Sequence, residues 1–203
     1  MKAWIVAVSL LLVACHHHAG PPGTPHGNDL ILGSMGIPEF STTANRCPSA
    51  NGEGHIVLTF PDGQKRVKGD CKGGVMVGDW KAWYQNGAVV WEASLKSGLL
   101  DGSFVSWHPN DQKMAQVHYA DGAATGTLKA WWYNGKKRAE GDYVGGKKNG
   151  CWETWHDNGQ KATKGAFSDD AQVLTWLGWT PTGDKRKQEL GGEAAHGKCM
   201  ITL

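Results

Sequence analysis

One 24-residue period governs this chain and limits what it can fold into. The stretch Gly126-Thr-Leu-Lys-Ala-Trp-Trp-Tyr-Asn-Gly135 is matched, 24 residues later, by Gly150-Cys-Trp-Glu-Thr-Trp-His-Asp-Asn-Gly159. The same spacing continues backwards without insertion, and a repeat domain over residues 47–190 follows. Five full units begin at Gly54, Gly78, Gly102, Gly126 and Gly150, and a degenerate sixth begins at Leu174. A fixed period of this length is typical of architectures built by stacking one small unit on the next.

Each unit predicts one β-hairpin. Its third position is apolar or aromatic, and its sixth is Trp in five of the six units. Asn86-Gly87 and Asn134-Gly135 follow this apolar run, and Asn-Gly predicts a type I′ hairpin turn. A second strand then carries Lys65, Lys113, Lys137 or Lys161, and a Gly-rich connection leads to the next unit. We therefore expect an all-β fold, with tandem hairpins forming an elongated, twisted antiparallel meander without a central globular core.

The sixth-position tryptophans are the candidate binding residues. They are Trp83, Trp107, Trp131, Trp155 and Trp179. The third and sixth positions differ in parity, so in a regular strand they point to opposite faces unless a bulge intervenes. Two interpretations remain open. The column either packs beneath neighbouring strands as core, or is partly exposed and stacks on glycan rings or a partner's side chains.

The first residues predict export. Met1-Lys2 precedes a run of 12 mostly apolar residues, Ala3 to Ala14, which is shorter than the about 20 needed to span a bilayer. Residues 1–14 therefore fit a signal peptide. The run ends in Leu12-Val-Ala-Cys15, which resembles the lipobox of bacterial lipoproteins. That resemblance implies a lipid on Cys15 as membrane anchor and, with His16 next, an outer-membrane location in the cell envelope, facing the periplasm or the cell surface. An ordinary signal peptide with a coincidental cysteine is the alternative.

The segments that flank the repeats are predicted to be irregular. Residues 15–46 are rich in His, Gly and Pro and predict a flexible linker, and residues 191–203 form a C-terminal tail. The three histidines His16–His18 are interpreted as solvated linker rather than as a metal site.

Four further cysteines predict disulfides in an oxidising compartment. They are Cys47, Cys71, Cys151 and Cys199. A Cys47–Cys71 bridge would staple the start of the array and stabilise it by about 3 kcal/mol. Cys151 and Cys199 lie two units apart, or about 19 Å along a regular stack. They can pair only if the tail folds back, which Gly191-Gly192 permits, so their pairing stays open.

The sequence offers no grounds for catalysis, a cofactor or a metal. Gly141 to Lys148 comes close to a phosphate-binding loop but has Lys148 where Ser or Thr is required. His108 and His156 occupy equivalent positions two units apart and are too distant to share a zinc ion. No nucleophile motif is present. A net charge of +2, without a basic run interleaved with aromatics, predicts no nucleic-acid partner.

The pattern Gly-x-Trp-x-x-Trp-[Tyr/His]-x-Asn-Gly, followed by Gly-x-[Tyr/Phe]-x-x-Gly, resembles the bacterial variant of the MORN repeat found in YwqK-type antitoxins. The resemblance covers residues 54–173 well and 174–190 weakly. It implies a hairpin array used for binding, with no catalytic residues to carry over. With the export signal, it predicts a non-catalytic lipoprotein scaffold for an unknown protein partner, of a type compatible with an immunity protein of the periplasm. The alternative is a glycan-binding module that uses exposed repeat tryptophans.

Overall fold

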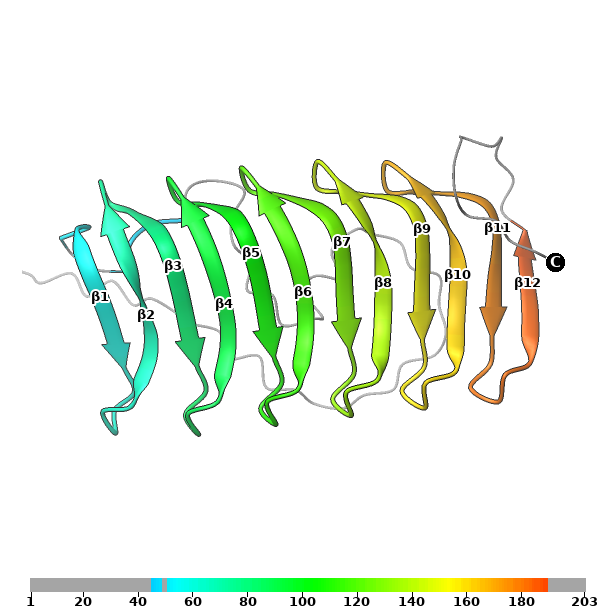
Figure 1. Ribbon diagram of the computed structural model, residues 1–203, viewed down its shortest axis with the longest axis horizontal. Helices are drawn as coiled ribbons and strands as arrows, with labels where there is room; N and C mark the ends of the chain where they lie inside the picture. The colour runs from blue at the N-terminus through cyan, green and yellow to red at the C-terminus, as the bar shows by residue number, and fades with distance from the viewer. Residues whose placement is uncertain (1–44, 49–50, 190–203) are drawn as a thin grey trace, which may run out of the picture.

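The computed structural model describes residues 45–48 and 51–189 and consists of one antiparallel β-sheet. Its 12 strands lie in sequence order, each beside the next, as Figure 1 shows. The strands are β1 (Gly54–Thr59), β2 (Lys65–Lys72), β3 (Val75–Trp83), β4 (Val89–Lys96), β5 (Leu99–Trp107), β6 (Lys113–Ala120), β7 (Ala123–Trp131), β8 (Lys137–Val144), β9 (Lys147–Trp155), β10 (Lys161–Ser168), β11 (Ala171–Trp179) and β12 (Lys185–Glu189). The predicted meander of tandem hairpins is confirmed. Over the described residues, no helix is long and apolar enough to cross a membrane.

The turns at the two sides of the sheet differ, and the prediction for the Asn-Gly turns is wrong in type. In the second unit, φ is positive at Gly87 (85°) but not at Asn86. The amide of Gly87 donates to the Tyr84 carbonyl (3.0 Å), and that of Tyr84 donates to Ala88 (2.8 Å). This is a type I turn closed by a left-handed glycine, because a type I′ turn needs positive φ at both central residues.

The type I′ turns are the short connections between units. Gly145 (φ 57°) and Gly146 (φ 84°) both have positive φ and link β8 directly to β9. At the equivalent connection between β6 and β7, Asp121 (φ 45°) and Gly122 (φ 82°) do the same. The Gly-rich stretch is therefore a two-residue hairpin turn, and the strands of adjacent units pair as tightly as those within a unit.

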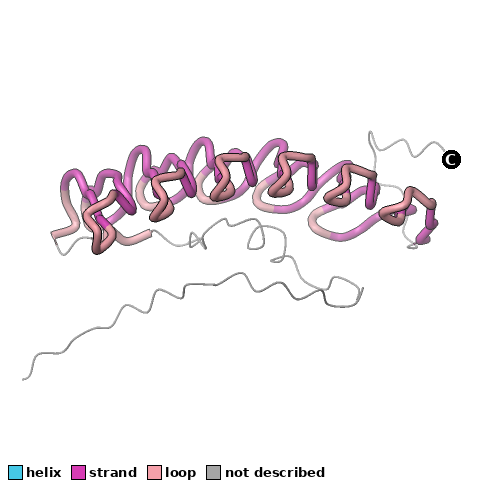
Figure 2. The backbone as a smooth tube through the Cα atoms, turned by 90° about the horizontal axis from the view of Figure 1, so that it is seen from below, coloured by secondary structure: helices cyan, strands magenta, loops and turns pink. Residues whose placement is uncertain are grey.

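The glycine that begins each full unit bends its strand. Gly78, Gly126 and Gly150 have φ of 68–69° although they lie inside β3, β7 and β9. The register shifts beside Gly78, since Lys68 pairs with Lys81 but Asp70 pairs with Val77. An advance of two residues along β2 therefore corresponds to an advance of four residues along β3. Extra residues on one strand form a bulge that bends and twists it. The curved strands are visible in Figure 1, and Figure 2 views the bent sheet from the side of the Asn-Gly turns.

The core lies on one face of this bent sheet and is built from pairs of complementary size. The Trp152 ring lies against Gly141, where an added Cβ would be 2.2 Å from the indole. Trp80 and Trp176 lie against glycines in the same way. The equivalent pairs, 24 residues apart, are Gly69–Trp80, Ala93–Phe104, Val117–Leu128, Gly141–Trp152 and Gly165–Trp176. As the third-position side chain becomes smaller, from Trp through Phe to Leu, the residue paired with it becomes larger, from Gly through Ala to Val, which keeps a single-layer core densely packed.

Edge-to-face aromatic contacts connect successive units within this core. The Trp152 ring centroid lies 5.2 Å from that of Tyr143 and 5.8 Å from that of Phe167, and Phe167 lies 5.0 Å from Trp176. Such geometry is the favoured one for aromatic pairs. Burial raises the pKa of Tyr119 to about 12, so its hydroxyl stays neutral at physiological pH.

A lysine takes part in the core beside these rings. The Lys148 side chain is 6% exposed, and its Nζ lies 5.3 Å from the Trp152 ring centroid and 5.0 Å from that of Phe167. Burial lowers the pKa of Lys148, while the charge of Asp170 acts in the opposite direction. The two rings solvate the ammonium through cation–π contacts, which explains how a cation occupies this position.

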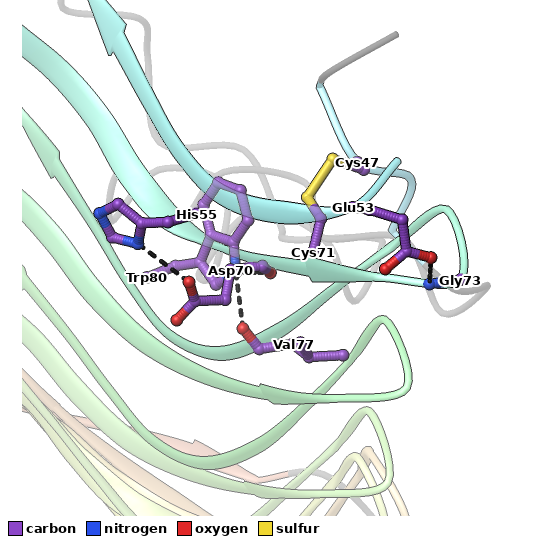
Figure 3. The surroundings of a disulfide bond; sticks show 8 residues. All are labelled: Cys47, Glu53, His55, Asp70, Cys71, Gly73, Val77 and Trp80. Atoms are coloured by element: carbon purple, nitrogen blue, oxygen red, sulfur yellow. Dashed lines mark hydrogen bonds and ion pairs between the residues drawn. A yellow bond between two sulfur atoms is a disulfide. The ribbon is translucent and has the colours of Figure 1, made fainter. Parts of the chain in front are cut away.

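A disulfide fastens the N-terminal segment to the array. Cys47 and Cys71 are joined by a disulfide, as Figure 3 shows. Their Cα atoms are 5.8 Å apart, and the predicted bridge is confirmed. The Cys47 amide donates to the Gly74 carbonyl (2.9 Å), and the Asn45 amide donates to Gly98 (2.7 Å). Residues 45–48 therefore run along the connecting turns of the first two units.

Several predictions fall outside the described residues. They are the signal peptide 1–14, Cys15, most of the linker 15–46, the tail 191–203 and Cys199. Cys151 is disulfide-bonded. A Cys151–Cys199 bridge stays a prediction.

Candidate functional site: a stripe of tryptophans and lysines

The sixth-position tryptophans lie on the face opposite the core. In β7, Leu128 and Ala130 are buried, whereas Lys129 between them is exposed and Trp131 is half-buried. Trp83, Trp107, Trp155 and Trp179 are half-buried as well. The parity argument is therefore correct for the two aromatic positions. This column is neither fully buried core nor a row of fully exposed rings.

The strand register places lysines between these tryptophans. Trp131 pairs directly with Lys137, and Trp155 pairs directly with Lys161. The same pairing joins Trp107 to Lys113 and Trp179 to Lys185, whereas Trp83 pairs with Val89. We call the resulting line the basic–aromatic stripe; it consists of Trp83, Trp107, Lys113, Trp131, Lys137, Trp155, Lys161, Trp179 and Lys185. Equivalent residues recur about every 9.6 Å, because each hairpin contributes two strands about 4.8 Å apart.

Each lysine at the centre of the stripe also reaches the tryptophan of the following unit. Lys137 Nζ lies 5.3 Å from the Trp155 ring centroid, and Lys161 Nζ lies 6.0 Å from that of Trp179. These cation–π contacts hold ammonium groups beside the rings. A neutral ring that stacked on Trp155 or Trp179 would have to displace them.

Ammonium groups outnumber carboxylates on this part of the face. Glu140 Oε2 is 2.7 Å from Lys137 Nζ, and its Oε1 is 3.9 Å from Lys129 Nζ. Glu153 is shared in the same way by Lys161 (3.0 Å) and Lys164 (3.1 Å).

The carboxylate of Glu153 remains ionised within this cluster. Although burial raises its pKa, hydrogen bonds from Lys161 and Lys164 outweigh that effect and hold the pKa below the usual value. Four ammonium groups therefore face two carboxylates, and the surplus charge attracts an anionic partner.

Side chains at the hairpin tips fix the spacing of the stripe. In the third to fifth units, the residue after the tryptophan donates a hydrogen bond to the carbonyl of the next tryptophan along the array: His108 Nε2 to Trp131 (3.1 Å), Trp132 Nε1 to Trp155 (2.9 Å) and His156 Nε2 to Trp179 (2.9 Å). The asparagines add a second row. Asn134 Nδ2 donates to Asp157 O (2.7 Å), and Asn158 Nδ2 donates to Pro181 O (2.7 Å). His108 and His156 thus join adjacent units.

A shallow trough of about 590 Å³ lies on the same face over β1–β5. Its polar groups already bind one another. His55 Nδ1 contacts Asp70 Oδ1, the pair joined by a dashed line in Figure 3, at 2.9 Å, and Ser94 Oγ donates to Asp79 Oδ1 (2.7 Å). The Ser94 hydroxyl is therefore bound to a carboxylate and not to a histidine base, so this arrangement is not that of an activated nucleophile.

The stretch that resembled a phosphate-binding loop has a different structure. Gly145 and Gly146 form the turn from β8 into β9, so a strand follows the glycines. A phosphate-binding loop instead leads into the N-terminus of a helix. Across residues 45–48 and 51–189, no three His, Cys, Asp or Glu side chains are grouped so that they could hold a metal ion.

The sequence pattern predicted the tryptophan column and placed Lys113, Lys137 and Lys161 in the second strands, but it did not predict that these lysines lie between the tryptophans. Trp131 and Lys137 are six positions apart, so no basic run with interleaved aromatics is visible along the chain. The pairing of the sixth position with the first residue of the return strand is the signal that would have found the stripe. No family model matches this chain, and a comparison with curated proteins finds no match either.

Proposed function

We propose that this protein is a non-catalytic scaffold of the cell envelope that binds an acidic protein partner along the basic–aromatic stripe. The observation that carries the proposal is the register-aligned alternation of tryptophan and lysine across successive hairpins. Tryptophan is enriched at the residues that dominate protein–protein binding energy. The surplus of ammonium groups supplies charge complementarity to a partner rich in Asp and Glu.

The rigidity of the stripe supports the same function. The side chains of His108, Trp132 and His156 are bonded to the backbone of the following unit, so the tryptophans need little ordering when a partner binds. A preorganised surface loses less conformational entropy on association, and more of the contact energy becomes affinity.

Glycan binding is the second candidate, favoured by the even spacing of the tryptophans. A row of rings at a constant period suits a polymer with a constant repeat. The ammonium groups beside Trp155 and Trp179 favour carboxylates over neutral rings, which is why we place a protein partner first.

The double substitution Trp131→Ala/Trp155→Ala tests the stripe. With the full chain purified in detergent, we expect wild type to capture one stoichiometric protein from envelope extract. The variant should bind that purified protein at least about tenfold more weakly, a loss of about 1.4 kcal/mol. The dissociation constant should also rise with salt.

Tyr133→Ala is the matched control, since Tyr133 is 58% exposed at a hairpin tip outside the stripe. It should leave the affinity unchanged. A second variant, Lys137→Ala/Lys161→Ala, keeps both tryptophans and should weaken binding while flattening its salt dependence. Equal affinities of wild type and both double variants would contradict the proposal, and binding of polysaccharide lost in the Trp variant would establish the glycan alternative.

We propose that a lipid on Cys15 anchors this scaffold to the outer membrane. The support is the tetrapeptide Leu12-Val-Ala-Cys15 at the end of the apolar run. The Cys15→Ser protein should appear in the soluble fraction of fractionated cells. Without acyl chains on residue 15, only the 12-residue apolar run could hold the protein to a membrane, and that run is too short to span a bilayer. Continued tight membrane attachment of that variant would show that the anchor is not Cys15.

A further inference from the structure

The two end strands of the sheet differ in chemistry. The last strand, β12, has the sequence Lys-Arg-Lys-Gln-Glu, with Lys185 and Arg186 both exposed. The first strand, β1, has the sequence Gly-His-Ile-Val-Leu-Thr, and His55 is its only titratable residue. Charged residues on an edge strand oppose pairing with another chain, whereas an uncharged, apolar edge invites it.

The C-terminal end is closed in a second way, at its turn. Thr182 Oγ1 donates to Asp184 Oδ2 (2.7 Å), and the Asp184 amide donates to Thr180 Oγ1 (3.0 Å). Thr180 and Thr182 stand where His156 and Asn158 stand in the preceding unit, and those two side chains bond to the next hairpin. At the end of the array the equivalent hydroxyls are instead bonded within their own turn. They therefore offer no side-chain donor to a following hairpin.

Within the part of the chain that the structure describes, the N-terminal end shows no such closure. All six residues of β1 pair with β2 on one side, and among the described residues no strand pairs with its other side. Ile56, Val57 and Leu58 follow one another there, and Val57 is 46% exposed. The segment 45–48 runs along the connecting turns instead of beside β1. The open edge therefore presents backbone donors and acceptors flanked by apolar side chains.

We propose that β1 pairs antiparallel with β1 of a second copy of this chain, about a two-fold axis at Val57. In this register Val57 faces the partner's Val57, Ile56 faces the partner's Leu58 and His55 faces the partner's Thr59. No like charges are opposed, and apolar pairs of this kind stabilise antiparallel sheets.

The two-fold register also continues both faces of the sheet. Ile56 is buried on the core face, and Leu58 beside it on the same face is half-buried, so an Ile56–Leu58 pair extends the core across the axis. Such an isologous contact closes on itself. Because β12 opposes pairing, assembly stops at two copies and does not continue into a fibre.

The experiment measures the mass of the full chain by native mass spectrometry from detergent. Wild type should have twice the mass of one chain, and Val57→Lys should have the mass of one chain because it places two like charges opposite each other at the axis. Val144→Lys is the matched control: Val144 is 61% exposed on the internal strand β8, and this variant should remain a dimer. A single-chain wild type, or a dimeric Val57→Lys variant, overturns the proposal.

Cysteine cross-linking tests the register independently of stability. Directly opposed residues of an antiparallel pair have Cα atoms about 4.5–5.5 Å apart, within the range that a disulfide spans. Val57→Cys should therefore give a covalent dimer on a non-reducing gel, and Val144→Cys should not. A wild-type dimer whose Val57→Cys variant gives no covalent dimer, or no more than Val144→Cys gives, overturns the β1–β1 pairing. Neither result depends on the stripe, so this proposal and the proposed function succeed or fail separately.

Discussion

Gly141→Ala is expected to lower the free energy of unfolding by about 3 kcal/mol, the upper end of the usual cost of overpacking. The added Cβ would lie 2.2 Å from the Trp152 ring, so the indole or the strand must move. Movement also breaks the hydrogen bond from Trp152 Nε1 to the Asp142 carbonyl (3.2 Å). Denaturant unfolding followed by tryptophan fluorescence measures the loss, and hydrogen exchange locates it at β8 and β9.

The compensating change is already present elsewhere in the chain. Ala93 of the second unit faces Phe104 of the third, so Gly141→Ala/Trp152→Phe rebuilds a pair that the array accommodates. The double variant should be destabilised by less than the sum of the two single variants, by about 1–2 kcal/mol of interaction energy. Gly178→Ala serves as control, because its Cβ would meet nothing closer than 3.6 Å. Strict additivity of the two substitutions would contradict the size-complementary pairing.

Cys47→Ala should lower the free energy of unfolding of the N-terminal end of the array by about 3 kcal/mol, because the bridge closes a loop with a sequence separation of 24 residues. Backbone hydrogen bonds also hold the segment 45–48, together with the Asn45 side chain, whose Nδ2 donates to the Gly98 carbonyl (2.8 Å). Without the bridge the segment should detach, and the Met76 amide, which donates to the Asn45 carbonyl (3.0 Å), should exchange with solvent faster.

Hydrogen exchange distinguishes this local effect from general unfolding. In a stack where each unit contacts only its neighbours, the last hairpins should keep wild-type protection. The Trp152 and Thr154 region of β9 provides that internal reference. Uniform acceleration from β1 to β12 would show that the array unfolds as one unit, and unchanged exchange at Met76 would show that the bridge does not hold the segment.

The repeat pattern predicted the fold because each hairpin is specified locally. The spacing from Gly126 to Gly150 sets one unit, and the apolar residues within it set the strands. The role of those leading glycines was not predictable from one unit. Gly126 lies in a bulge created by pairing with the previous hairpin, so its positive φ depends on two units together.

The Asn-Gly turns show the same limit. The Asn134 side chain accepts from the Lys136 amide (3.0 Å) and donates to the Asp157 carbonyl of the next unit (2.7 Å). The first contact favours a type I turn with a following left-handed glycine, and the second uses an acceptor 23 residues away. A rule based on the Asn-Gly pair alone considers neither contact and therefore predicts the wrong turn.

The stripe was only half predictable for a related reason. Counting along the chain finds Trp131 and Trp155, but the position of Lys137 between them follows from cross-strand register beside a bulge. Lysines that are far apart along the sequence lie in one row on the sheet once the strands pair. Composition and net charge therefore say little about surface charge in a repeat protein of this kind.

The tip hydrogen bonds from side chains to backbone carbonyls of another unit run in one direction, from a unit to the one that follows. An interior unit consequently carries a tip donor for its successor and a tip acceptor for its predecessor, so these tip contacts recur along the array. Duplicating or deleting one 24-residue block would lengthen or shorten the chain and keep the tip contacts, provided that the core pair at the new junction also matches in size. Copy number is thus a variable that evolution can adjust in single steps, and the reach of the binding face changes with it while its local chemistry stays constant.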